Sequence, residues 1–128
     1  MAIIAHPAMA GATRIAPVAL IGTLFRALGA DGIIYPNVGG RFGYSTETCR
    51  AIAAAADAPM GGLKPSLPVP AGGMTLKRIP EILSFYRENA MLLIGGDLLG
   101  AGDRMIEEAR AFQYAVADFD YQLGIAAE

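Results

Sequence analysis

The sequence predicts an α/β fold in which four parallel strands alternate with helices, as in half of a closed (β/α)8 barrel. Four short apolar runs, each followed by a segment of helical periodicity, are the main observation behind this prediction. Two glycine doublets, Gly72-Gly73 and Gly95-Gly96, end the third and fourth runs, where a parallel sheet carries its ligands. An open doubly wound sheet is the competing architecture. The glycine-rich loop at residues 36–44 disfavours it, because that loop does not fit the G-x-G-x-x-G pattern of dinucleotide-binding sheets.

The boundaries of the four strand–helix units follow from the apolar runs and from helix-capping residues. The strands are expected at residues 3–6, 32–35, 66–69 and 91–94. The helices are expected to begin near Pro17, at Ser45 or Thr46, near Pro80 and near Asp103. Proline is favoured in the first turn of a helix, and serine or threonine just before it. The residues after Asp118 are expected to form a short helix or an irregular docking segment.

Composition restricts the classes of protein to consider. The chain is expected to be a single domain, residues 1–128, with 54% hydrophobic and 17% charged residues, so much of it should be buried. A net charge of −2 with scattered basic residues argues against a nucleic-acid partner. The apolar stretches fall well short of the ~20 residues of a membrane span, and the first residues show no secretion signal. Because the lone Cys49 excludes an internal disulfide, the expected location is cytoplasmic.

The two glycine doublets predict a site for an anion. Glycine at the exit of a strand lets backbone N–H groups approach a ligand, because no Cβ stands in the way. The two exits lie one strand–helix unit apart, so neighbouring strands would offer amides to one ligand. The loops after strands 7 and 8 of a (β/α)8 barrel form a phosphate site of this kind. The alternative is that each doublet only turns the chain into the helix that follows.

Four segments match, in order, the motifs of one known family. The segment from Leu67 to Gly73 is similar to that family's strand 7 motif, and the segment from Met91 to Gly100 to its strand 8 motif. Residues 6–11 resemble its strand 5 segment, and residues 29–32 with 36–44 resemble strand 6 and its mobile loop. The family is that of the RuBisCO large chain, and within it the RuBisCO-like proteins that do not carboxylate. The resemblance implies the C-terminal half of a (β/α)8 TIM-type barrel.

The resemblance also implies which residues form the site. The backbone amides expected to bind phosphate are those of Gly72, Gly73, Gly95 and Gly96. Two residues are expected to be catalytic: His6 matches a histidine that contacts the hydroxyl-bearing carbons of the substrate, and Arg41 lies where the carboxylase has its mobile-loop lysine. The loop residues expected at the site are Asn37, Gly39 and Gly40. Alternatively, His6 is structural, Arg41 is only solvated and Asn37 is a turn residue.

Departures from the family pattern argue against carboxylation. Pro7 stands in place of a phosphate-binding arginine, Ile34 in place of a histidine, and Ala71 in place of a substrate-binding serine. Charge-assisted hydrogen bonds contribute roughly 1.5–3 kcal/mol each, so the affinity for one of the two phosphates of a bisphosphate would fall sharply. Arg41 in place of lysine is not conservative either, because a planar guanidinium replaces a compact point charge.

The metal of the family is expected to be bound elsewhere. The resemblance implies that the parent enzyme uses Mg²⁺, held by a carbamylated lysine with a neighbouring aspartate and glutamate on earlier barrel strands. Neither Lys64 nor Lys77 is followed by an Asp-Glu pair at a strand end. The metal ligands are therefore not expected in this chain.

The expected function is that of part of a RuBisCO-like enzyme that acts on a phosphorylated sugar or keto-acid by Mg²⁺-assisted enolisation. The reaction would be of the isomerase, enolase or decarboxylase type, without CO2 fixation. The alternatives are a non-catalytic phosphate-binding half-barrel and a structural half that requires an N-terminal partner. A half-barrel has two open sheet edges and exposes residues that would fill a closed barrel, such as Ile33, Leu67, Val69 and Leu93. The chain is therefore expected to form a homo-oligomer or to pair with the N-terminal half of the barrel.

Overall fold

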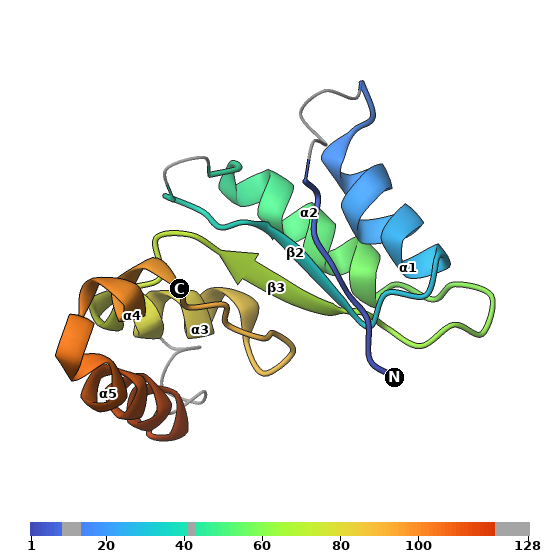
Figure 1. The fold of residues 1–128 in the computed structure, drawn as a ribbon. Helices are drawn as coiled ribbons and strands as arrows, with labels where there is room; N and C mark the ends of the chain where they lie inside the picture. Colours follow the sequence, from blue (N-terminus) through green and yellow to red (C-terminus); the bar gives the residue numbers. More distant parts are fainter. Residues whose placement is uncertain (9–13, 41–42, 120–128) are drawn as a thin grey trace.

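A parallel sheet lies at the centre of the computed structural model, which describes residues 1–8, 14–40 and 43–119 (Figure 1). Its strands are β1 (Ile4–Ala5), β2 (Gly32–Pro36) and β3 (Leu67–Ala71), in the order β1-β2-β3. Both neighbouring pairs are parallel, and Pro36 lies opposite Ala71 at the carboxyl end of the longer pair. The parallel sheet predicted from the apolar runs is confirmed for these three strands.

The fourth predicted strand, residues 91–94, lies beside β3 but pairs with it only briefly. Leu93 forms an isolated parallel bridge with Ala71. The N–H groups of Met91 and Leu93 donate to the carbonyls of Pro68 and Pro70, at 2.9 and 3.4 Å. Proline has no N–H, so β3 cannot donate back from those two residues. The prolines of β3 therefore explain why the fourth strand is reduced to a bridge.

Helices follow each strand, as predicted. Their bounds are η2 (Val18–Leu24), α1 (Phe25–Ala27), α2 (Thr46–Asp57), η3 (Leu76–Arg78), α3 (Ile79–Tyr86), α4 (Gly96–Gly100), η4 (Gly102–Arg104) and α5 (Met105–Ala117). Ser45 caps α2 by accepting a hydrogen bond from the Thr48 N–H at 3.1 Å, and Pro80 lies in the first turn of α3. The helix expected from Asp103 begins at Met105, after the short turns α4 and η4.

Two details complete the helical part. The helix that follows Pro17 is π-helical through η2 and then closes with the single turn α1. No helix among the described residues is long and apolar enough to cross a membrane. The tail predicted after Asp118 lies outside the described residues from residue 120 onward.

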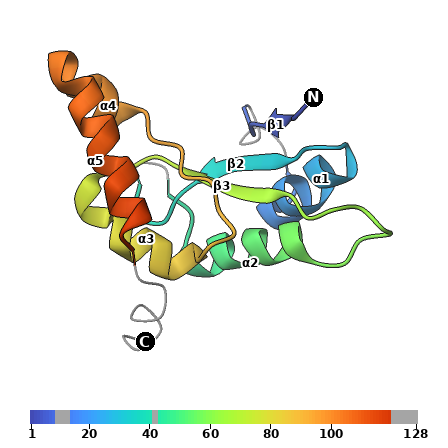
Figure 2. The same ribbon diagram turned by 90° about the horizontal axis from the view of Figure 1, so that it is seen from below.

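The main core lies between the sheet and the helices on one of its faces, where Figure 2 shows α1 and α2. Ile33 and Tyr35 alternate along β2 and are fully buried in this core. They pack with Ile21 of η2 and Ile52 of α2. A smaller cluster joins α3 to α5 and is centred on three residues: Ile79, Leu83 and Phe112.

The opposite face of the sheet carries exposed apolar side chains. Leu67 and Leu93 are 43% and 42% exposed, which confirms the expectation that they lie on an open surface. Ile4, which pairs along the same face, is half exposed. The same expectation was wrong for Ile33 and Val69, which are fully buried. Ile33 belongs to the helix-covered face of β2, and Val69 is packed against its sheet neighbours, with its Cγ2 lying 3.2 Å from the position of a Cβ on Gly32.

One buried arginine links the first helix to the connection between α2 and β3. Arg26 of α1 is only 3% exposed. Its guanidinium donates to the carbonyls of Ala58, Leu63 and Lys64, the last two at 2.8 and 2.9 Å. Among the described residues these three carbonyls, and no carboxylate, pair with the buried cation, a role that its position in the sequence pattern did not reveal.

Candidate functional site

The predicted site residues lie together at the carboxyl edge of the sheet. His6 follows β1 and is exposed, Asn37 follows β2, and Gly72 follows β3. Gly95 lies two residues after Leu93, which bridges to the end of β3. Parallel strands end at the same edge, so the four strand exits form one rim. Arg41, the other predicted catalytic residue, lies outside the described residues.

The two glycine doublets leave amides available on this rim. We call Gly72-Gly73 the first glycine turn and Gly95-Gly96 the second. In the first turn both residues have left-handed backbones, with φ of +83° and +66°, a region that glycine adopts without strain. In the second turn, Gly96 begins α4. Among the described turns and loops, no hydrogen bond is donated by the backbone N–H of Gly73, Gly95 or Gly96, whereas the parallel bridge between Ala71 and Leu93 directs the Gly72 N–H toward the Leu93 carbonyl.

The loop after β2 touches the first glycine turn through backbone atoms. We call residues 37–40 the β2 loop. A Cβ on Gly73 would lie 3.2 Å from the Gly40 Cα, and a Cβ on Gly40 would lie 3.2 Å from the Gly72 carbonyl oxygen. Side chains at these positions would push the two segments apart. The glycines therefore allow a direct backbone contact between the exits of β2 and β3.

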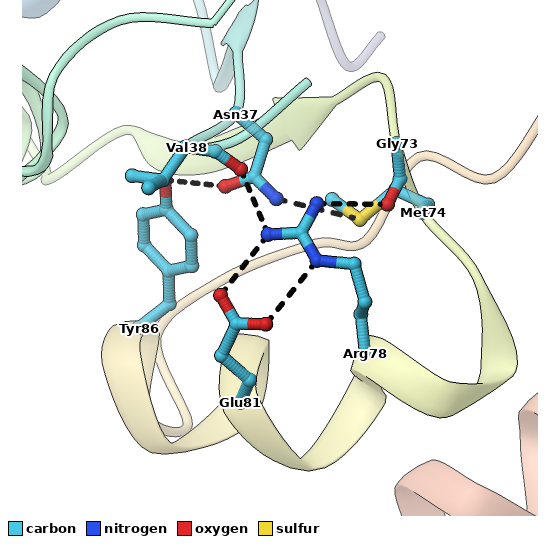
Figure 3. Close-up of polar contacts among 7 residues, drawn as sticks. All are labelled: Asn37, Val38, Gly73, Met74, Arg78, Glu81 and Tyr86. Atoms are coloured by element: carbon cyan, nitrogen blue, oxygen red, sulfur yellow. Dashed lines mark hydrogen bonds and ion pairs between the residues drawn. The ribbon is translucent and has the colours of Figure 1, made fainter.

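Arg78 joins these two segments (Figure 3). Its Nη2 donates to the Val38 carbonyl at 2.8 Å, and its Nη1 donates to the Gly73 carbonyl at 3.0 Å. Glu81, one turn later at the start of α3, accepts from Nε at 3.2 Å and from Nη2 at 3.0 Å. This ion pair and its hydrogen bonds lower the pKa of the Glu81 carboxyl and raise that of the Arg78 guanidinium. The guanidinium is thus a bridge between two strand exits, held in orientation by a carboxylate.

Asn37 faces the interior rather than the rim. It is 2% exposed, its Oδ1 accepts a hydrogen bond from the Tyr86 hydroxyl at 3.1 Å, and its Nδ2 lies 3.9 Å from the Met74 sulfur (Figure 3). The expected role of Asn37 at the site stays a prediction. The side chain anchors the β2 loop to α3 and to the residue after the first glycine turn.

Buried hydroxyl and thiol groups surround that anchor. The ring of Tyr35 lies edge-on to Tyr86, with centroids 6.2 Å apart, and its hydroxyl has no hydrogen-bond partner among the described residues. The thiol of Cys49 donates to the Pro36 carbonyl at 3.6 Å. Burial raises the pKa of all three groups, so they stay protonated in the folded chain. Cys49 is fully buried.

The three positions that depart from the carboxylase pattern lie near the same rim. Ala71 ends β3, Pro7 follows β1, and Ile34 lies within β2. Ile34 pairs with Val69 and so shares the face of β2 that does not carry Ile33 and Tyr35. The side chains of Pro7, Ile34 and Ala71 therefore offer neither a positive charge nor a hydroxyl group to a ligand.

The described residues do not fit a metal site. Across residues 1–8, 14–40 and 43–119, no three His, Cys, Asp or Glu side chains come together as ligands.

Arg78 and Tyr86 are the site residues that sequence reasoning missed. Both act across long separations, Arg78 on Val38 and Tyr86 on Asn37, and nothing local marks such contacts. The spacing of Arg78 and Glu81 across the start of α3 is the only signal that could have drawn attention to the pair.

Comparison with known proteins gives relatives of one kind. No family model matches the chain. It is 59% identical over 116 residues to a 5-methylthioribulose-1-phosphate isomerase of Rhodospirillum rubrum, covering 91% of this chain and 31% of that protein. It is 30% identical to a 2,3-diketo-5-methylthiopentyl-1-phosphate enolase of Geobacillus kaustophilus, covering 89% of this chain and 29% of that protein. The crystal structure of a RuBisCO-like protein from Rhodopseudomonas palustris superposes with a TM-score of 0.83 at 48% identity, covering 93% of this chain and 31% of that one.

These matches agree with the resemblance found in the strand motifs. The chain spans about a third of the length of the relatives that it matches. The structure neighbours are barrels of the RuBisCO type, of which this chain matches a fragment. The chain is thus a homologue of the C-terminal part of RuBisCO-like proteins and carries that part of their (β/α)8 barrel.

Proposed function

We propose that this chain supplies the phosphate-binding rim of a RuBisCO-like enzyme that enolises a phosphorylated sugar or keto-acid, as an isomerase or enolase and not as a carboxylase. The observation that carries the proposal is the set of amides on the two glycine turns. The N–H groups of Gly73, Gly95 and Gly96 lie at the exits of neighbouring strands, and no hydrogen bond of the described turns and loops uses them. Converging backbone amides are a common way for proteins to bind phosphate.

The relatives support a substrate with one phosphate. The names of the two matched enzymes each contain a single phosphate, on carbon 1 of the compound acted on. One phosphate needs one binding site, which the amides of the two glycine turns would form; we call this site the cradle. Pro7, Ile34 and Ala71 offer no charged grip to a second phosphate. The proposal therefore excludes ribulose bisphosphate as the substrate and excludes CO2 fixation.

The remaining predicted residues have proposed roles beside the cradle. The exposed imidazole of His6, at the exit of β1, would contact the hydroxyl-bearing carbons of the substrate. Arg41, which lies outside the described residues, would also contact the substrate. The resemblance implies Mg²⁺ in the complete enzyme, and no described residue is assigned to it.

The proposal includes a partner for the open side of the sheet. Exposed apolar residues such as Leu67 and Leu93 line the face that a closed barrel would fill. Either a second copy of this chain or the N-terminal half of a barrel would cover it. The N-terminal half is the occupant that would also complete an enzyme.

Titration of the chain with inorganic phosphate, after labelling its glycines with ¹⁵N, tests the cradle. The amide signals of Gly72, Gly73, Gly95 and Gly96 should move together and give one dissociation constant. Gly61 and Gly62 serve as internal controls, because they are exposed glycines with positive φ in the connection that leads into β3, at the other end of the sheet. Phosphate shifts confined to the control glycines, or absent from all glycines, would refute the proposal.

A further inference from the structure

We propose that Arg78 is a positioning residue that locks the β2 loop against the first glycine turn and so sets the shape of the rim. One guanidinium donates to a carbonyl of each segment, Val38 and Gly73, at 2.8 and 3.0 Å. The two segments come from different strands, and Val38 lies 40 residues from Arg78 in the chain. The bridge therefore fixes two strand exits relative to one another.

The hydrogen-bond capacity of Arg78 is almost fully used within the protein. A guanidinium has five N–H groups. Four of them are accounted for by Val38, Gly73 and the two oxygens of Glu81. The side chain is accordingly engaged by the protein rather than free to bind a ligand, which assigns it to positioning and not to substrate contact.

Two glycines beside the guanidinium leave space for it, because they carry no Cβ. A Cβ on Gly39 would lie 3.3 Å from Nη2, and a Cβ on Gly73 would lie 3.0 Å from Nη1. Both contacts are closer than real Cβ atoms comfortably allow. Two glycines on different segments thus make room for the same group. This close fit is the steric counterpart of the hydrogen bonds, because the same Nη atoms make both contacts.

Glu81 determines how the guanidinium is turned. Its two oxygens accept from Nε and Nη2, a bidentate arrangement that fixes the plane of the fork. Lysine could not reproduce this arrangement, because its ammonium is a single point of charge. The 23% exposure of the Arg78 side chain leaves the bridge partly shielded from solvent, whereas Glu81 at 61% is open to it.

The experiment compares Arg78→Lys and Glu81→Gln with Arg104→Lys in the ¹⁵N-glycine-labelled chain. Arg104 of η4 forms an ion pair with Glu108 of α5 at 3.7 Å, so its variant controls for the change from arginine to lysine in an ion pair away from the rim. Without phosphate, Arg78→Lys should shift the amides of Gly39, Gly40 and Gly73 and leave Gly61 and Gly62 unmoved, which also shows that the rest of the chain is folded. Glu81→Gln should cause smaller shifts of the same glycines, and Arg104→Lys should cause none.

Phosphate titration gives the second measurement, and its part in the inference rests on the proposed function. Arg78→Lys should weaken phosphate binding at Gly72 and Gly73 about tenfold, because two charge-assisted hydrogen bonds that place this turn are lost. Unchanged glycine amides in Arg78→Lys would overturn the positioning role, as would shifted amides with undiminished phosphate binding. If phosphate fails to bind the wild-type turns while Arg78→Lys still shifts Gly39 and Gly40, the proposed function fails and the bridge between the two segments stands.

Discussion

Replacing the two residues of the first glycine turn separately should distinguish backbone strain from close packing. Gly72 and Gly73 both have positive φ, so alanine at either position costs about 1–2 kcal/mol of left-handed strain. A Cβ on Gly72 meets nothing within 4 Å. A Cβ on Gly73 would lie 3.0 Å from the Arg78 Nη1 and 3.2 Å from the Gly40 Cα. Overpacking of this kind costs about 1–3 kcal/mol more.

We therefore expect Gly72→Ala to lower the free energy of unfolding by about 1–2 kcal/mol and Gly73→Ala by about 2–5 kcal/mol. Urea unfolding followed by circular dichroism measures both values. Gly61→Ala is the control, because Gly61 has a φ of +50° and open space around it, and it should resemble Gly72→Ala. Phosphate affinity should fall further in Gly73→Ala, since the β2 loop is displaced. Equal destabilisation by the two substitutions would refute the close contact between the β2 loop and the turn.

Three other predictions concern the core and the open face. Arg26→Met should lower the free energy of unfolding in urea by about 2–4 kcal/mol, because three carbonyls lose a charged donor. A variant as stable as the wild-type chain would contradict this role of Arg26. Burial raises the pKa of Cys49, Tyr35 and Tyr86, so the unfolded state ionises first. The free energy of unfolding should then fall as the pH rises above about 8.5, and a flat profile between pH 7 and 10 would refute it. Sedimentation at micromolar concentration should find dimers or larger species. Covering roughly 1,000 Å² of apolar surface offers a gross gain of about 25 kcal/mol before the costs of association. A compact monomer would count against this expectation.

The sequence was sufficient for the elements whose signals are local. The Ser45 cap, the proline in the first turn of α3 and the first three apolar strand runs all depend on neighbouring residues, and the structure confirms them. The short pairing of residues 91–94 also has a cause that is visible in the sequence: Pro68 and Pro70 alternate along β3 and have no N–H to donate. Their missing N–H groups face the fourth segment, as the donation from Met91 to the Pro68 carbonyl reveals. That consequence needs the register, which the sequence did not supply.

The faces of the strands were harder to assign. Ile33 and Ile34 are identical neighbours in a fully apolar run, so no polar residue marks which of them faces the helices. Only the packing of Ile33 against Ile21 and Ile52 decides it. The pairings of Arg78 with Val38 and of Tyr86 with Asn37 span 40 and 49 residues, beyond any periodic pattern. The first glycine turn, by contrast, could be located from sequence, because its positive φ values restrict the residue type at the turn itself.

Contacts with the core of this chain hold the β2 loop and the first glycine turn in place. Tyr86 holds the β2 loop through Asn37, and Met74, one residue after the first glycine turn, is buried in the same cluster. Arg78 joins the two segments by hydrogen bonds to one carbonyl of each. None of these contacts involves the open face of the sheet, where the rest of a barrel would lie. Phosphate binding should therefore persist in this chain without a partner, whereas turnover should require the remaining strands. The two properties are separable, and measuring them with and without an N-terminal half distinguishes a phosphate-binding module from an incomplete enzyme.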